Sequence, residues 1–281
     1  MCQLMAMSAN VPTDARFSFS GLVERGGGSD IHRDGWGIAF YRGRGVQEFR
    51  DPQPSVDSQV AALVKSQPIK SEVVISHIRQ ANVGEVCLEN THPFVRELWG
   101  RYWVFAHNGQ LRGARRKLAL GRFKPVGSTD SEWAFCWLLG QLENQFDGWP
   151  RSPKRLGEFV GYCAAQLDQL GVANFLLSDG RALYAHCSTR LHWLTRRAPF
   201  GVARLKDIEM EVDFSRETTP HDIVSVIATE PLTVDESWQQ LASGDTIIAL
   251  KGIVQTLGRG SSSSTGWSAH LLASQGRGVL D

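Results

Sequence analysis

Residues 102–109 read YWVFAHNG, and this stretch is the best guide to the fold. The run from Trp103 to Ala106 is short, apolar and rich in aromatic residues, which is typical of a buried strand. Asn108-Gly109 at its end is a strong signal for a tight turn. The same geometry has a second interpretation, because an Asn side-chain N–H and a Gly backbone N–H at a strand end can converge on an oxyanion.

Similar strand-like runs recur along the chain, and helix-like runs lie between only some of them. The predicted strands are residues 36–41, 73–77, 102–107, 175–178, 182–187, 223–229 and 246–251, and the predicted helices are residues 58–66, 131–144 and 156–170. Because the strands come in groups, we predict an α+β fold of antiparallel or mixed sheets covered by helices. The capping-box sequence TDSE at 129–132 predicts a helix that begins after Thr129.

The composition excludes several classes of protein. The chain has 30 Lys and Arg against 29 Asp and Glu, which argues against a general nucleic-acid or anionic-membrane binder. Its apolar runs are far shorter than the roughly 20 residues of a membrane helix, and no signal peptide is visible. Five widely spaced cysteines without a Cys-x-x-Cys pair indicate neither disulfides nor zinc. We expect a cytoplasmic protein without a metal or cofactor.

Cys2 directly follows the initiator Met, and a small residue there usually allows Met removal. The freed α-amine would have a pKa of about 7.7–8.0, below that of an ordinary thiol. One residue would then supply both a nucleophile and its base, as in the N-terminal Thr hydrolases. The alternative is a cysteine that occurs at this position by chance.

Two charged residues suit an amino-acid head group. Arg79, within SHIRQAN, carries the side chain that captures a carboxylate by two hydrogen bonds, although a surface ion pair is the commoner role. Asp130 lies in the first turn of a predicted helix, where it favours the helix dipole or pairs with an ammonium group. Residues 98–129 hold seven Lys and Arg and no acid. This stretch is either a solvated basic loop or attracts an anionic substrate or partner.

Taken in order, these motifs resemble one family. The residues that carry the resemblance are Cys2, DGWG at 34–37, Arg79, NTHP at 90–93, HNG at 107–109 and TDSE at 129–132. They resemble the class II glutamine amidotransferases, most closely the stand-alone YafJ-type members. The resemblance implies an Ntn-hydrolase fold, a four-layer αββα sandwich of two mostly antiparallel sheets covered by helices. It implies one domain at 1–256, followed by a Gly/Ser-rich tail at 257–281 that we expect to be flexible.

The resemblance also implies the roles of the reacting groups. Cys2 would be both nucleophile and base, and Asn108 and Gly109 would form the oxyanion hole. The thiolate would attack the side-chain amide of glutamine, and water would hydrolyse the resulting thioester to release glutamate.

The same resemblance implies a set of substrate contacts. Arg79 would bind the α-carboxylate of the substrate and Asp130 its α-ammonium group. Asn90 and His92 match a family stretch near the glutamine pocket, so we expect them to contact substrate as well. The chain departs from the family at Asn82, where many members have Thr.

These assignments predict a glutaminase-type amidase that releases ammonia from glutamine. Because only the tail follows the amidotransferase-like region, we expect any ammonia acceptor to be a separate synthase subunit. The alternative with the same chemistry is a stand-alone hydrolase of γ-glutamyl amides that has no ammonia-transfer partner. Two further alternatives are an Ntn hydrolase of N-acyl compounds and a non-enzymatic module that binds an anionic partner through residues 98–129. The sequence indicates no oligomeric state.

Overall fold

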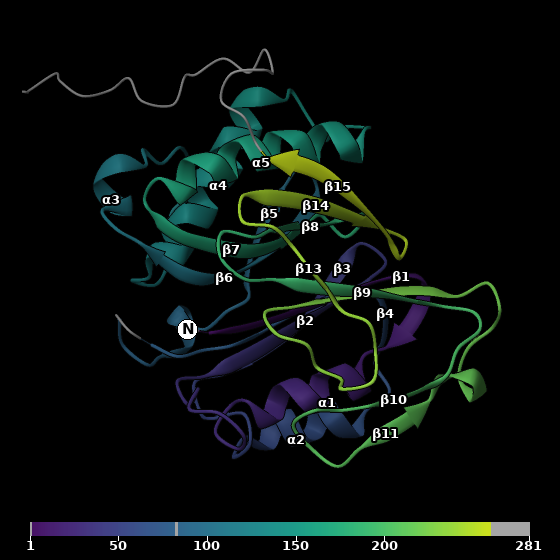
Figure 1. Ribbon diagram of the computed structural model, residues 1–281. Helices are drawn as coiled ribbons and strands as arrows, with labels where there is room; N and C mark the ends of the chain where they lie inside the picture. The colour runs from purple at the N-terminus through teal and green to yellow at the C-terminus, as the bar shows by residue number, and fades with distance from the viewer. Residues whose placement is uncertain (1, 82–83, 260–281) are drawn as a thin grey trace, which may run out of the picture.

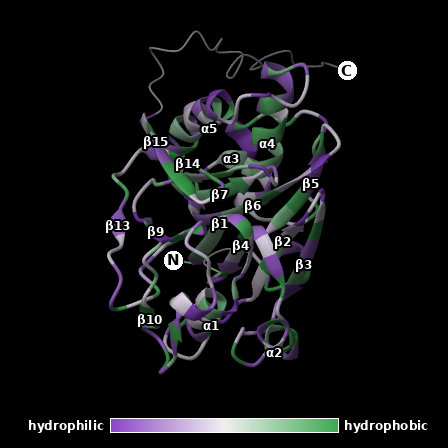
Figure 2. Ribbon diagram, turned by 90° about the vertical axis from the view of Figure 1, so that its right-hand side faces the viewer, coloured by the Kyte–Doolittle hydropathy of each residue, from purple (hydrophilic) through white to green (hydrophobic). Residues whose placement is uncertain are grey.

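The computed structural model describes residues 2–81 and 84–259, and within them two β-sheets lie face to face between helices (Figure 1). Helices α1 (Arg16–Glu24) and α2 (Gln59–Ser66) cover the outer face of one sheet. Helices α4 (Asp130–Gln145) and α5 (Pro153–Asp168) cover the other, and Figure 2 shows the same order of layers from the side. The predicted α+β fold with four αββα layers is confirmed.

Strand pairing in the two sheets is antiparallel throughout the described residues. The first sheet there contains, in spatial order, β13 (Gln239–Gln240), β9 (His192–Arg197), β12 (Ile223–Ala228), β1 (Gln3–Asp14), β4 (Lys70–Ile78), β2 (Trp36–Arg42) and β3 (Gly45–Asp51). The second contains β15 (Ile253–Arg259), β14 (Asp245–Leu250), β8 (Leu183–His186), β7 (Gly171–Ser178), β6 (Arg101–Leu111) and β5 (Phe94–Leu98). The remaining elements are α3 (Ala114–Lys117), the ribbon β10 (Val202–Arg204) and β11 (Glu211–Asp213), and the 3₁₀ turns η1 (Leu88–Asn90) and η2 (Phe214–Arg216).

The central strands are apolar without alternation because both of their faces are buried. On β6, Trp103 and Phe105 pack toward the helices α4 and α5, whereas Val104 and Ala106 face the opposite sheet. The same division holds on β1, where Met5 faces α1 and α2 and its neighbours face the second sheet. The continuous apolar run at 103–106 is therefore the signature of a middle layer.

The predicted strands correspond to β2, β4, β6, β7, β8, β12 and β14, and the predicted helices to α2, α4 and α5. The sequence did not indicate β1 or α1. The first eight of the twelve residues of β1 read QLMAMSAN and lack the β-branched residues that mark a strand. Helix α1 contains two serines and a glycine, and no side chain caps its start at Ala15.

Helix α4 begins where the sequence predicted, but only half of the capping box forms. The Glu132 N–H donates to Thr129 Oγ1 at 3.2 Å, which confirms Thr129 as the N-cap. The Glu132 carboxylate does not reach back to the cap. It accepts hydrogen bonds from Arg96 and from the backbone N–H groups of Val126 and Gly127. The carboxylate therefore fixes the loop in front of α4.

The predicted boundary between domain and tail falls inside a strand. Strand β15 continues through Arg259, so residues 257–259 are part of the second sheet. Residues 260–281, the rest of the predicted tail, lie outside the described residues. Among the helices of the described part, none has the length and apolar character needed to cross a bilayer.

Candidate active site

Six of the seven predicted site residues line one cavity of about 750 Å³. They are Cys2, Arg79, His92, Asn108, Gly109 and Asp130. These residues come from the start of β1, the end of β4, the loop before β5, the end of β6 and the first turn of α4. The fold thus brings together side chains that are far apart in the sequence.

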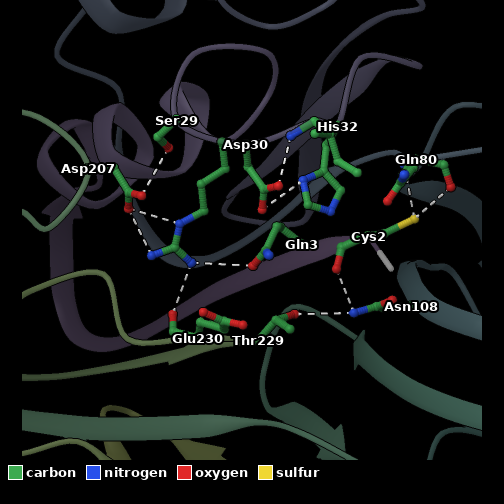
Figure 3. A network of polar contacts seen from close by, with 12 residues as sticks. Cys2, Gln3, Ser29, Asp30, His32, Gln80, Asn108, Asp207, Thr229 and Glu230 are labelled. Carbon is green, nitrogen blue, oxygen red and sulfur yellow. Dashed lines mark hydrogen bonds and ion pairs between the residues drawn. The ribbon is translucent and has the colours of Figure 1, made fainter.

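The pairing of β1 with β4 fixes the position of Cys2. Gln3 and Leu4 lie opposite Ile78 and His77, which places Cys2 beside the segment that follows β4. The Gln80 N–H donates to Cys2 Sγ at 3.2 Å, and the thiol donates to the Gln80 carbonyl at 3.4 Å (Figure 3). The thiol is held by backbone groups and lines the cavity.

Burial determines the protonation of this thiol. Loss of solvent raises the pKa of Cys2 above its ordinary value of 9.0, and the Gln80 N–H and the Arg79 charge oppose that rise. The thiol is therefore protonated at neutral pH. A nucleophilic attack by Cys2 requires a base that takes the proton as the new bond forms.

Asn108 connects the nucleophile to Thr229, the residue that directly follows strand β12. Its Nδ2 donates to the Cys2 carbonyl at 2.6 Å and to Thr229 Oγ1 at 3.4 Å (Figure 3). Thr229 Oγ1 also accepts the Leu4 N–H at 2.9 Å. The buried Asn108 Oδ1 has no hydrogen-bond partner within the part of the chain that the structure describes. Thr229 was not foreseen from the sequence, because no local motif marks it.

Gly109 lies where the backbone of β7 leaves no room for a side chain. A Cβ added to Gly109 would lie 1.8 Å from the Val172 carbonyl oxygen. Glycine therefore allows β6 to pair closely with β7 next to Asn108, and it keeps the backbone accessible from the cavity.

Arg79 and Asp130 present opposite charges to the same cavity. The Arg79 side chain is 3% exposed, and its Nη1 donates to the Glu85 carbonyl at 3.0 Å. Among residues 2–81 and 84–259, its buried Nη2 has no hydrogen-bond partner. Asp130 accepts the Leu111 N–H on Oδ2 at 2.6 Å, which ties it to the end of β6. This arrangement leaves a guanidinium N–H and a carboxylate for a zwitterionic head group.

Asn90 is the predicted site residue that does not line the cavity. Its Nδ2 donates to the Glu85 carbonyl at 3.1 Å and its Oδ1 accepts the Ser128 N–H at 2.7 Å. These bonds join the segment after Arg79 to the segment before α4. Asn90 therefore holds together two segments that flank the cavity without lining it itself. Its contact with substrate stays a prediction, and Asn82 lies outside the described residues.

Three buried histidines lie at or near the cavity. His92 and His107 line it, and the ring of His77 stacks on that of His92. Burial lowers the pKa of His77 to about 3, and it also lowers the pKa values of His92 and His107. His107 bonds Ser131 Oγ at 2.8 Å and the Val172 carbonyl at 3.0 Å. All three rings are therefore neutral at pH 7.

A buried arginine that the sequence did not flag holds the segment around Gln3. Arg25, at the end of α1, bonds Asp207 at 2.9 Å and Gln3 Oε1 at 3.3 Å. It also donates to the backbone carbonyls of Glu230 and Pro231. A guanidinium that saturates its donors in this way locks the start of β1 to the end of β12.

The basic stretch foreseen at 98–129 supplies part of the cavity wall. Arg112, Arg115 and Arg116 line the cavity at and beside α3, and all three are exposed. Arg115 donates to the Ser128 carbonyl at 2.6 Å. Within the part of the chain that the structure describes, no group of three His, Cys, Asp or Glu side chains is placed to bind a metal.

Comparison with known proteins identifies the family. The family model described as "Glutamine amidotransferases class-II" matches residues 1–272. The chain belongs to the class II glutamine amidotransferases. It is 59% identical over 248 residues to "Putative glutamine amidotransferase YafJ" of Escherichia coli K12, covering 87% of this chain and 96% of that protein.

Solved structures of this family share the fold. The crystal structure of a "predicted glutamine amidotransferase" from Pseudomonas aeruginosa is 53% identical, covers 90% of this chain and 99% of its own, and has a TM-score of 0.73. The PRPP amidotransferase of Bacillus subtilis is similar in fold alone, at 14% identity and a TM-score of 0.59, over 93% of this chain and half of its own. The Ntn-hydrolase sandwich implied by the sequence is thus confirmed for this member of the family.

Replacing Gly109 by Ala should damage both the fold and the site. The added methyl group collides with the Val172 backbone, so we expect a loss of about 1–3 kcal/mol or more in the free energy of unfolding. Denaturant titration followed by circular dichroism measures this loss. Gly121→Ala is the control, because its nearest neighbour would be 4.0 Å away, and it should stay within about 0.5 kcal/mol of the parent. Equal stability of the two variants would contradict the crowding at Gly109.

Stability should fall in acid partly through His77. Its pKa is about 3 in the folded chain and 6.5 ordinarily, so between these values the unfolded state binds a proton that the folded state does not. Lowering the pH from 6 to 4 therefore favours unfolding by about 1.4 kcal/mol per pH unit from this residue. We expect the stability of the parent, relative to His77→Phe, to fall by that amount in urea titrations at each pH. A constant difference across this range would show that His77 is not buried neutral.

Proposed function

We propose that Cys2 hydrolyses the γ-amide of glutamine or of a γ-glutamyl compound through a thioester. The observation that carries this proposal is the convergence in one cavity of a thiol, a carboxamide N–H, an unpartnered guanidinium N–H and a carboxylate. A thiol beside oxyanion donors suits acyl transfer. The Arg79 and Asp130 pair suits a free α-amino acid head group, which simple amides and N-acyl compounds lack.

The proposed reaction has two halves. In the first, Cys2 Sγ attacks the amide carbon, and its proton passes to the α-amine that removal of Met1 frees. Asn108 Nδ2 and the Gly109 N–H stabilise the oxyanion, because the Asn108 bond to Thr229 is long enough at 3.4 Å to be exchanged for a stronger one. The protonated amine then gives its proton to the leaving nitrogen. In the second half, water hydrolyses the thioester and releases glutamate.

The test is an intact mass of the purified protein before and after incubation with 6-diazo-5-oxo-L-norleucine, a reactive glutamine analogue. We expect loss of Met1 and one adduct that maps to Cys2, and no adduct on Cys2→Ala. Asn108→Ala should lower kcat for glutamine by about 10²–10³-fold, the usual effect of removing one oxyanion donor. Processed protein that hydrolyses N-acyl compounds and takes up no adduct would contradict the proposal.

The size of the cavity favours γ-glutamyl compounds as a second class of substrate. Glutamine has ten non-hydrogen atoms. Even if each took up the roughly 30 Å³ of a water molecule in the liquid, which is more than a bonded atom needs, the molecule would occupy at most about 300 Å³. The cavity of about 750 Å³ leaves space for a group larger than ammonia on the amide nitrogen. A hydrolase of γ-glutamyl amides would need no ammonia acceptor, whereas a glutaminase would supply ammonia to a separate synthase subunit.

These two roles differ in a measurable ratio. If γ-glutamyl amides are the substrates, the purified chain alone should hydrolyse γ-glutamyl dipeptides with a kcat/KM at least tenfold above that for glutamine. Release of glutamate, measured for both substrates under the same conditions, gives this ratio. A preference for glutamine would favour the ammonia-supplying role. The Asp130→Asn variant is the control. It should lower kcat/KM by the same factor for both substrates, because both present the same α-ammonium group.

A further inference from the structure

The imidazole rings of His77 and His92 are buried near the start of β1, and the proposed chemistry so far does not use them. His77 is fully buried and His92 is 4% exposed, and their ring centroids are 4.2 Å apart. Among the described residues, neither ring nitrogen of His92 has a hydrogen-bond partner, and the His77 nitrogens make no hydrogen bond of ordinary geometry, with the His107 backbone as their nearest polar neighbour. Leaving a buried donor or acceptor unpaired costs about 1–3 kcal/mol, so the unpaired nitrogens of His92, which lines the cavity, and of His77 stacked on it indicate a polar ligand.

The strand register shows that His77 faces the nucleophile. Along β4, Val73 and Ile75 face the space between the sheets, and His77 continues this side of the strand. Leu4, which lies opposite His77, faces the same space. Cys2 is two residues before Leu4 and so belongs to the same face. Cys2 and His77 are therefore diagonal neighbours across the two strands. The Cβ atoms of such a pair are typically roughly 7 Å apart.

The second ring reaches this position because Gly37 has no side chain. A Cβ on Gly37 would lie 2.2 Å from the His92 carbonyl oxygen, so the backbone at His92 packs directly on β2. Gly37 is paired with His77 across β2 and β4. The ring of His92 therefore stacks on His77 from above and also lines the cavity. Gly37, the last residue of the motif at 34–37, therefore makes room for this stack.

We infer that His77 and His92 bind the water molecule that hydrolyses the thioester on Cys2. This inference rests on the proposed function. A neutral imidazole has one donor and one acceptor nitrogen, so the pair can hold a water by both its oxygen and a hydrogen. The substrate head group is served elsewhere, by Arg79 and Asp130.

The step balances without a further reactant. The water oxygen forms a bond to the thioester carbon, and one water proton passes to the neutral α-amine of Cys2. The C–S bond then breaks, its electron pair returns to Sγ, and the thiolate takes back that proton. The products are glutamic acid and the free thiol. In this step His77 and His92 are positioning residues, because they hold the water and exchange no net proton.

The decisive variant is His77→Phe, which keeps the ring shape and the stack on His92 but removes both nitrogens. Acylation should survive, so we expect 6-diazo-5-oxo-L-norleucine to label Cys2 within about twofold of the parent rate. Hydrolysis should slow, and kcat for glutamine should fall on the order of 10²-fold, as for a misplaced reactant. Acid-quenched samples should then carry the mass of one glutamyl group on Cys2. Added hydroxylamine should restore turnover and yield γ-glutamyl hydroxamate.

Three further variants complete the test. His92→Phe should accumulate the same thioester, and His77→Gln, which keeps a donor and an acceptor, should recover most of kcat. His186→Phe removes a buried histidine on β8 that is bonded to Thr246 and Asp168, and it should lower stability without accumulating thioester. A low kcat of His77→Phe without accumulated thioester would overturn the inference, since the slowed step would then precede hydrolysis of the thioester. Absence of labelling in the parent would overturn the proposed function itself.

Discussion

The antiparallel pairing of β1 with β4 on one side and β12 on the other is the constraint on which the site depends. Because side chains alternate along a strand, a shift of one residue would turn Cys2 away from the space between the sheets. The register is held by apolar residues on both faces of β1 and by the hydrogen bonds between Leu4 and Thr229. A thiol at the chain end, where strands ordinarily fray, is in this way placed as firmly as a core residue.

The geometry of the candidate site is set largely by backbone groups. The thiol meets the N–H and carbonyl of Gln80, the Asn108 amide meets the carbonyl of Cys2, and Asp130 meets the Leu111 N–H. Side chains supply the charges, but strand ends and a helix start set their positions. Few of these backbone partners are visible in the sequence, because any residue type can provide them.

Much of the fold could be read from the sequence, and the failures have physical causes. Strand β6 and helix α4 carry strong local signals, an apolar run and an N-cap. Strand β1 is rich in Met, Ala and Ser and owes its conformation to its two neighbouring strands. The candidate site residues followed from ordered motifs, and all seven of them except Asn90 line the cavity. Thr229 and Arg25 could not be found from the sequence because most of the partners that hold them are more than a hundred residues away.

The bond between Leu4 and Thr229 spans 225 residues of chain. At the usual rates of synthesis, roughly 10 s or more pass between the emergence of the first residue and that of the second. Throughout that interval β1 lacks the strand that completes its pairing, so the beginning of the chain is open to enzymes that trim new polypeptides. Contacts so distant in sequence also form slowly once the chain is complete. The start of β1 is therefore accessible during synthesis well before the pocket that it lines can form.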